Sequence, residues 1–133
     1  RNPSGIEIGN QRRLRAVMNG WLLLILLMSM FAYFLSWLVF ARLSMARIER
    51  AILADGHPRP CPWDGPGVRT LWYARAIAFP VGRRNPVDDR LIDVPLVRRY
   101  ATRADRIRGW FLMVSGFVCT VVTLGTWFLL DSN

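Results

Sequence analysis

The chain has 133 residues, 53% of them hydrophobic, and a formal net charge of +9 at pH 7. This length leaves room for one small domain, and the sequence contains neither a glycine-rich phosphate loop nor a dinucleotide-binding fingerprint. All 18 basic residues are arginine. We attribute this mainly to the codon usage of a GC-rich genome. The alternative is phosphate or anionic-lipid binding, because the guanidinium fork matches phosphate geometry.

Two long uncharged segments dominate the chain. Residues 16–41 carry no charge over 26 positions, and residues 109–130 carry none over 22. As α-helices they would extend about 39 Å and about 33 Å, and a bilayer core is about 30 Å thick. We therefore predict an all-α membrane protein with two transmembrane helices, the first of which is too long for the apolar core of a signal peptide.

We expect the two membrane-crossing helices to form a helical hairpin with cytoplasmic helical extensions and a Pro/Arg-rich connecting loop. In chain order, the predicted segments are an extended N-terminal arm (1–10), the first transmembrane helix with its extension (11–55), the connecting loop (56–92), an amphipathic helix that continues into the second transmembrane helix (93–130), and a tail (131–133).

The first helix is expected to continue beyond the membrane. Ala41, Met45, Ile48 and Ile52 recur at helical spacing after the uncharged segment. Gly56 predicts the end of this helix, since glycine commonly follows a helix C-terminus.

The second helix is predicted to start at Asp93, because Asp is a good N-cap and Pro95 suits the first turn. Val97, Tyr100, Ala101, Ala104 and Ile107 share one face of it, and we expect it to run unbroken into the second uncharged segment.

The connecting loop is expected to fold against the membrane or a partner protein, because it has few consecutive apolar residues and many prolines and glycines. Four prolines between positions 58 and 66 exclude a helix there and favour polyproline II. Residues 71–81 fit either a strand or a short interfacial helix with Trp72 and Tyr73 at headgroup level.

The distribution of arginine predicts the orientation. Five arginines closely precede the second uncharged segment, and only Asp131, Ser132 and Asn133 follow its end at residue 130. Basic residues favour the cytoplasmic side. We therefore expect residues 42–108 to be cytoplasmic and both termini to lie on the opposite side of a bacterial inner membrane. The alternative orientation treats the basic residues at 12–15 as the cytoplasmic flank of a signal anchor.

Small and hydroxyl-bearing residues mark the faces through which the two helices could pack. Such residues allow close approach and hydrogen bonds between membrane helices. We expect them to mediate contact between the two helices of this chain, with a helix of another protein as the alternative. They are Ser29, Ala32, Ser36, Ser115, Gly116, Cys119, Thr120 and Thr123.

Two further groups are candidates for contact with other molecules. Juxtamembrane arginines are attracted to anionic lipid headgroups, and exposed aromatic and proline residues can dock a partner. The candidates for lipid or partner contact are Arg42, Arg47, Arg50, Arg98, Arg99, Arg103 and Arg106. The candidates for docking are Pro58, Pro60, Pro62, Trp63, Trp72 and Tyr73.

The sequence offers little for catalysis or cofactor binding. His57 and Cys61 are possible metal ligands, and Cys61 precedes a proline as some haem-ligating cysteines do, but two ligands make no site and a dipeptide is weak evidence. The uncharged segments also lack Asp, Glu, Lys, Arg and His, which pumps and coupled carriers usually need within the membrane. We predict no enzymatic activity in the isolated chain, no metal, no cofactor and no small-molecule substrate.

The first functional hypothesis is an accessory or assembly subunit of a larger integral-membrane complex of the respiratory, transport or secretion kind. Other integral-membrane subunits and anionic lipids are the expected partners, and nucleic acid is not. The second hypothesis is a membrane-anchored adaptor whose arginine-rich loop recruits an acidic protein or anionic lipid. A homo-oligomeric pore ranks third, because two helices cannot enclose a pore alone.

Overall fold

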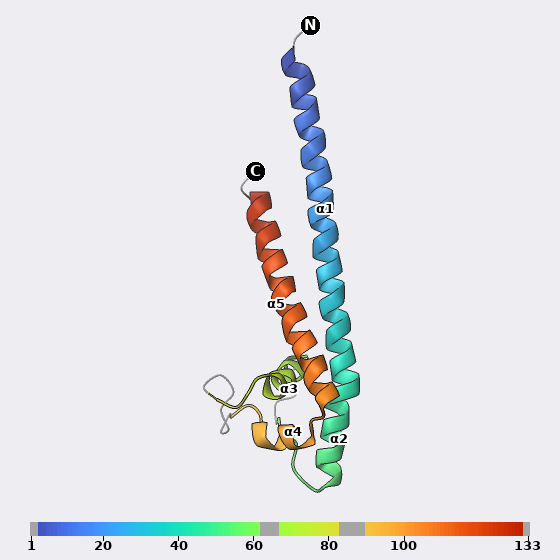
Figure 1. The fold of residues 1–133 in the computed structure, drawn as a ribbon, viewed down its shortest axis with the longest axis vertical. Helices are drawn as coiled ribbons and strands as arrows, with labels where there is room; N and C mark the ends of the chain where they lie inside the picture. The colour runs from blue at the N-terminus through green and yellow to red at the C-terminus, as the bar shows by residue number, and fades with distance from the viewer. Residues whose placement is uncertain (1–2, 62–66, 83–89, 132–133) are drawn as a thin grey trace.

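The computed structural model describes residues 3–61, 67–82 and 90–131, and these residues contain helices and no strands. The elements are α1 (Pro3–Val39), the π-helical turn η1 (Phe40–Met45), α2 (Ala46–Ala54), α3 (Val68–Ala78), α4 (Val94–Tyr100) and α5 (Arg103–Asp131). α1, η1 and α2 follow one another as one long helical rod, and α5 lies beside the rod and runs in the opposite direction (Figure 1). α3 and α4 lie at the end of the molecule farthest from the start of α1 (Figure 1).

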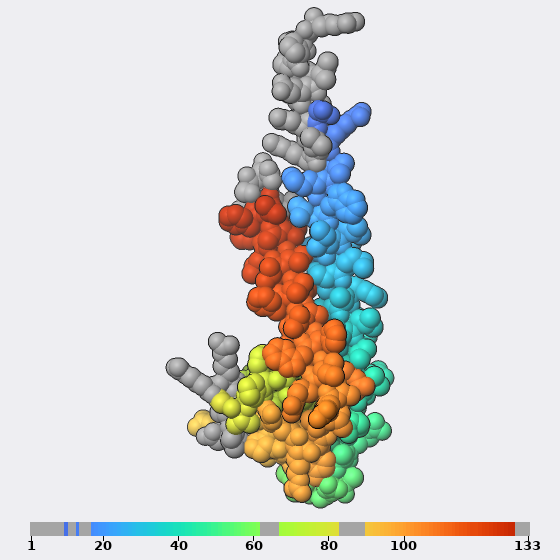
Figure 2. All heavy atoms as spheres, in the orientation of Figure 1, coloured from blue at the N-terminus to red at the C-terminus, as the bar shows by residue number. Residues whose placement is uncertain are grey.

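Two helical segments, Val17–Ala54 and Arg103–Leu129, are long and apolar enough to cross a membrane. Away from the end that carries α3 and α4, the two segments appear as two neighbouring columns of side chains. On the face seen in Figure 2, no other part of the chain covers these columns. Large apolar side chains are exposed along both columns, among them Phe31, Phe117 and Trp127.

The N-terminal segment differs from the predicted arm. Residues 3–10 form the first turns of α1 instead of an extended chain. Pro3 stands at the first helical position, where its missing N–H would have no partner in any case. Gly5 and Gly9 are accommodated within the helix at a cost of about 1 kcal/mol each relative to alanine.

The π-helical turn η1 changes which residues of the rod face inward. Its last bond runs from the Ala46 N–H to the Ala41 carbonyl, five residues back. The buried side chains are Phe40, Ser44, Ile48 and Ile52. Ile48 and Ile52 belong to the predicted stripe, whereas its first two members, Ala41 and Met45, are half-buried. In an α-helix, residues four apart differ by about 40° in direction around the helix axis. The wider π turn offsets this rotation between Phe40 and Ser44, so both side chains can face inward.

The rod ends where the sequence predicts. α2 finishes at Ala54, and Gly56 has a φ of 78°. The His57 N–H bonds to the Ile52 carbonyl at 3.1 Å, and the Gly56 N–H bonds to the Leu53 carbonyl at 3.1 Å. These bonds satisfy carbonyls that would otherwise be orphaned at the helix end.

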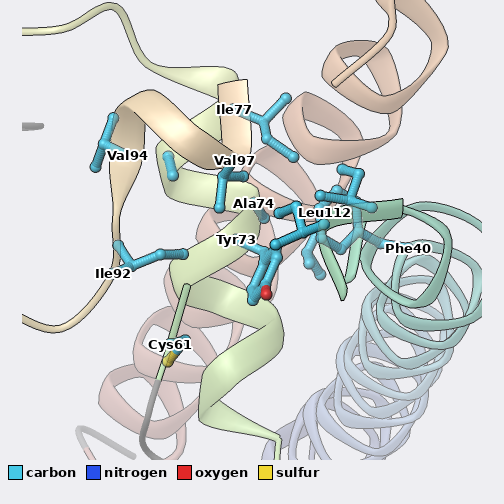
Figure 3. Packing of buried hydrophobic residues seen from close by; sticks show 12 residues of the cluster. Phe40, Cys61, Tyr73, Ala74, Ile77, Ile92, Val94, Val97 and Leu112 are labelled. Atoms are coloured by element: carbon cyan, nitrogen blue, oxygen red, sulfur yellow. The ribbon is translucent and has the colours of Figure 1, made fainter. Parts of the chain in front are cut away.

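The region after the rod supplies part of the hydrophobic core. Figure 3 shows Tyr73, Ala74 and Ile77 of α3 and Val97 of α4 gathered in one buried cluster with Phe40 and Leu112. The full buried cluster is Phe40, Ile48, Ile52, Cys61, Tyr73, Ala74, Ala76, Ile77, Ile92, Val94, Val97 and Leu112. The expectation that this region needs a membrane or partner to fold against is therefore corrected, because it packs on η1, α2 and α5 of its own chain.

The segment predicted as one helix from residue 93 onward is divided. Asp93 caps α4 by accepting a hydrogen bond from the Leu96 N–H at 3.0 Å, as the sequence predicts. Ala101 then takes an extended conformation (φ −78°, ψ 132°), and α5 starts at Arg103. The break resets the helical register, so Val97 is buried while Ile107 is 57% exposed. The single apolar face predicted across 97–107 does not exist.

Candidate functional site

The strongest polar feature is a carboxylate buried where the rod meets the start of α5. The Asp105 side chain has no exposed surface, and Arg47 of α2 donates to its Oδ2. Arg108 Nη1 lies 3.5 Å from Asp105 Oδ1 and 3.5 Å from the hydroxyl of Ser44. We call Asp105, Arg47, Arg108, Ser44 and Thr102 the Asp105 cluster.

Thr102 and Asp105 form a capping box at the start of α5. The Thr102 N–H donates to Asp105 Oδ2 at 2.8 Å, and the Asp105 N–H donates to Thr102 Oγ1 at 3.3 Å. Each side chain thereby satisfies a backbone N–H of the other residue. Arg47 also donates to the Tyr100 carbonyl at 3.1 Å, so one guanidinium connects the end of α4, the start of α5 and the rod. The cluster fixes the break between α4 and α5 against α2.

A second polar group lies on the side of α2 that faces α3. We call Glu49, Arg59, Arg69 and Tyr73 the Glu49 cluster. Arg69 Nη2 is 3.4 Å from Glu49 Oε2, and Arg59 Nε is 3.8 Å from Glu49 Oε1. The Tyr73 ring is fully buried, and its hydroxyl has no hydrogen-bond partner among the described residues. Burial, with a further contribution from the negative charge of Glu49, raises the pKa of Tyr73 well above its usual value.

At the end of the rod, Tyr100 donates a hydrogen bond to Asp55 Oδ2 at 2.5 Å. This bond favours the protonated phenol and raises the pKa of Tyr100. The three contacts described for α4, through Tyr100, the Asp105 cluster and the core, hold it on the rod.

The two long helices leave an open cleft of about 460 Å³ between them, which we call the large cleft. Tyr33 of α1 lies on one side, and Leu71 of α3 belongs to the lining. A Cβ on Gly116 would lie 3.0 Å from the Tyr33 ring, so glycine at this position lets α5 approach α1 closely, and a larger residue would require the ring to shift by a few tenths of an ångström. The lining is Tyr33, Leu71, Leu112, Met113, Gly116, Cys119, Thr120, Thr123 and Leu124.

A second space between α1 and α5, the small groove, has a volume of about 210 Å³. Leu35, Ser36 and Val39 of α1 and Arg108 and Phe111 of α5 line it. It shares no lining residue with the large cleft. Arg108 therefore belongs to two features, the Asp105 cluster and this groove.

The predicted packing residues do not form one common contact face. Gly116, Cys119, Thr120 and Thr123 line the large cleft, and Ser36 lines the small groove. The hydroxyls of Ser29, Ser115, Thr120 and Thr123 bond to carbonyls of their own helices. Ala32 is exposed. Of this set, Gly116 is the residue with a demonstrated close approach between α1 and α5.

The predicted arginines also separate. Arg47 binds Asp105, and Arg98 donates to the Phe79 carbonyl at 2.6 Å, so these two guanidiniums make contacts within the chain, and their contact with lipid or a partner stays a prediction. The remaining five are exposed: Arg42, Arg50, Arg99, Arg103 and Arg106.

Two of the predicted docking residues need a correction. Tyr73 and Pro60 are buried, and the Pro60 carbonyl accepts a hydrogen bond from the Asp93 N–H at 2.8 Å, so both pack against their own chain. Trp72 is half-buried beneath Arg75, whose guanidinium carbon lies 4.4 Å from the ring centroid. Pro58 is exposed, and Pro62 and Trp63 lie outside the described residues.

Asp105, Arg108, Ser44 and Thr102 were absent from the candidate residues identified from sequence. Thr102 and Asp105 have the Thr-x-x-Asp spacing of a capping box, which is a usable sequence signal. The contact between Ser44 and Arg108 joins residues 64 apart in the sequence and has no such signal.

No group of three or more His, Cys, Asp or Glu side chains in residues 3–61, 67–82 and 90–131 is placed to hold a metal ion. His57 is exposed and Cys61 is buried. Comparison of the chain with protein-family models, with curated proteins and with solved structures finds no match.

Proposed function

We propose that this chain is a non-catalytic accessory subunit of a larger integral-membrane complex. In this proposal α1 and α5 cross the bilayer as a hairpin, residues 42–108 lie in the cytoplasm, and both termini lie on the opposite side of a bacterial inner membrane. The uncharged spans contain no Asp, Glu, Lys, Arg or His, which suits a helix that packs more than one that carries ions.

The large cleft is the observation that supports a partner helix. Its lining brings together Gly116, Cys119, Thr120 and Thr123, which are small or hydroxyl-bearing residues. Thr120 and Thr123 remain exposed, so α1 does not cover this face of α5. Small residues let membrane helices approach closely, and packing is a main source of affinity between helices in lipid. A partner helix seated there would complete the contact that α1 leaves open.

Co-purification tests the proposal. The tagged protein is extracted in mild detergent and washed with about 0.5 M salt, which reduces the screening length to a few Å and removes surface ion pairs. We expect a stoichiometric set of membrane proteins to remain bound. Thr123→Phe, which fills the large cleft, should release them, whereas Val121→Phe on an exposed position of the same helix should not. A folded chain that elutes alone would refute the subunit assignment.

Five exposed arginines among the predicted contact residues favour a second function, a membrane-anchored adaptor for an acidic protein. They are Arg42, Arg50, Arg99, Arg103 and Arg106. An adaptor held by these side chains would lose its partner in the same salt wash, and Thr123→Phe would not change its binding. The one experiment therefore separates the two functions.

A further inference from the structure

The small groove joins an apolar wall to a single guanidinium. Leu35 and Val39 of α1 and Phe111 of α5 supply the apolar wall, and Ser36 adds one hydroxyl. Arg108 is the last charged residue before the uncharged stretch that starts at Gly109. A ligand suited to this groove has a negative group for Arg108 and an apolar part for the rest of the lining.

Arg108 has donors to spare. Its two hydrogen bonds among the described residues, to Ser44 and to Asp105, both use Nη1 and are both 3.5 Å long, at the outer limit for such bonds. A guanidinium carries five N–H donors. The Arg108 side chain is also 36% exposed, so solvent or a ligand can reach it.

The local charge balance favours an anion. Asp105 Oδ2 accepts hydrogen bonds from Arg47 and from both the backbone and the hydroxyl of Thr102, so Arg47 already supplies one positive charge to this carboxylate. Two guanidiniums face this one carboxylate. No carboxylate of the described residues lines the small groove. Arg108 therefore brings uncompensated positive charge to the groove. A guanidinium can bind a phosphate through two parallel N–H···O hydrogen bonds.

The dimensions favour a chain-shaped ligand. A volume of about 210 Å³ is below the roughly 300 Å³ at which pockets for compact small molecules begin. An acyl chain can enter a short groove and continue along the apolar surface of α1 and α5. We propose that the small groove binds an anionic phospholipid of the surrounding bilayer, with its phosphate on Arg108 and one acyl chain against Leu35, Val39 and Phe111.

This inference rests on the membrane insertion proposed above and is independent of partner subunits. It adds Arg108 to the residues expected to contact lipid. It also distinguishes binding of one lipid in the small groove from the general attraction between arginines and a negatively charged bilayer surface. Arg106 provides the comparison: it is an exposed arginine of the same helix, and it does not line the groove.

The test measures lipid binding to the purified chain in detergent by native mass spectrometry, with phosphatidylglycerol and phosphatidylcholine as the two probes. We expect a one-to-one adduct with phosphatidylglycerol at lower lipid concentration than with phosphatidylcholine. Arg108→Gln should weaken phosphatidylglycerol binding about tenfold or more, because it removes the charge-assisted hydrogen bonds from the guanidinium to the phosphate. Arg106→Gln should change it less than about twofold, the scale of a single exposed charge in salt.

Ser36→Phe supplies an independent variant, because it fills the groove and leaves every charge in place. It should weaken binding of phosphatidylglycerol as Arg108→Gln does, while circular dichroism confirms unchanged helix content. Equal losses from Arg106→Gln and Arg108→Gln would overturn the proposal in favour of non-specific attraction. Equal binding of the two lipids would also overturn it, since the guanidinium would then have no role. The measurement uses the chain alone, so its failure leaves the co-purification result untouched.

Discussion

The two ends of this molecule solve the problem of apolar surface in opposite ways. At the end formed by η1, α2, α3, α4 and the first turns of α5, the chain builds a closed core in which Phe40, Ile48 and Tyr73 have no exposed surface. Along the rest of α1 and α5, side chains such as Phe31 and Phe117 remain 63% and 71% exposed. One end supplies its own interior, and the other depends on its surroundings.

This contrast says where stability comes from. Burial of apolar surface stabilises a fold by about 25 cal/mol per Å², and a wholly aqueous environment would leave that contribution unrealised along the two long helices. The closed end also contains the two polar clusters, each of which joins elements far apart in the sequence. Substitutions there should affect folding of the isolated chain, whereas substitutions on the exposed helix faces should affect what the chain binds.

The largest effect is expected from Asp105→Asn. Removal of one partner from a buried ion pair costs about 3–5 kcal/mol, because the remaining charge loses its counter-charge. Arg47 is 41% exposed and can reach water, so we expect a loss near the lower limit, about 3 kcal/mol. Denaturant unfolding in detergent, followed by circular dichroism, measures the change in the free energy of unfolding.

Asp55→Asn is the matched control for this prediction. Asp55 also makes a short hydrogen bond, to Tyr100, but it is an exposed carboxylate. Its loss should change the free energy of unfolding far less than Asp105→Asn. Similar losses from the two variants would show that the burial of Asp105 has no special weight, and that the closed end is not organised around it.

Gly109→Val should have the next largest effect. A Cβ at residue 109 would lie 3.3 Å from the Ala74 carbonyl oxygen and 3.4 Å from Phe40 Cε2, so α5 could no longer approach α3 so closely. Overpacking of this kind costs about 1–3 kcal/mol. The same unfolding measurement applies, and a lower thermal midpoint should accompany the loss.

Gly125→Val tests whether the effect belongs to the closed end. A Cβ at Gly125 meets nothing within 4 Å, and valine is a better helix former than glycine. We expect no loss of stability in this variant. A loss equal to that of Gly109→Val would mean that glycine is required for some reason other than close approach.

The same contrast explains how much could be predicted from the sequence. The two apolar helices are evident because a long uncharged segment needs no tertiary information to be recognised. The end of the rod and the start of α4 are also local features, since Gly56 and Asp93 act on their own neighbours. These predictions agree with the structure.

The closed end was predictable only in part. The break at Ala101 has a local signal in Thr102 and Asp105, but the apolar spacing across it favours a continuous helix. The π turn has no local signal in the sequence, and it buries Phe40 and Ser44 on the side of the rod that faces the core. The burial of Tyr73 could not be predicted either. Its helix, α3, has 11 residues with apolar side chains on several faces, so the sequence does not indicate which face the rest of the chain covers.

The smallest expected effect is a dependence of stability on alkaline pH through Tyr73. Burial and the nearby negative charge of Glu49 raise the pKa of Tyr73, so the folded chain holds the phenolic proton more tightly than the unfolded chain does. The free energy of unfolding should therefore be constant through neutral pH and fall as the pH rises above about 10, the pKa of an unperturbed tyrosine. Denaturant unfolding at several alkaline pH values measures this fall.

Tyr73→Phe and Tyr100→Phe separate the two tyrosines whose pKa values are raised. The Tyr100 hydroxyl makes one exposed hydrogen bond, to Asp55, so Tyr100→Phe should remove little of the pH dependence of stability. Tyr73→Phe should remove most of it and cost little at neutral pH, because the buried hydroxyl has no partner among the described residues. If Tyr73 instead titrates near pH 10 with no loss of stability, its hydroxyl reaches water in solution. The closed end would then be open beside Glu49, and the contrast between the two ends would be smaller than the structure indicates.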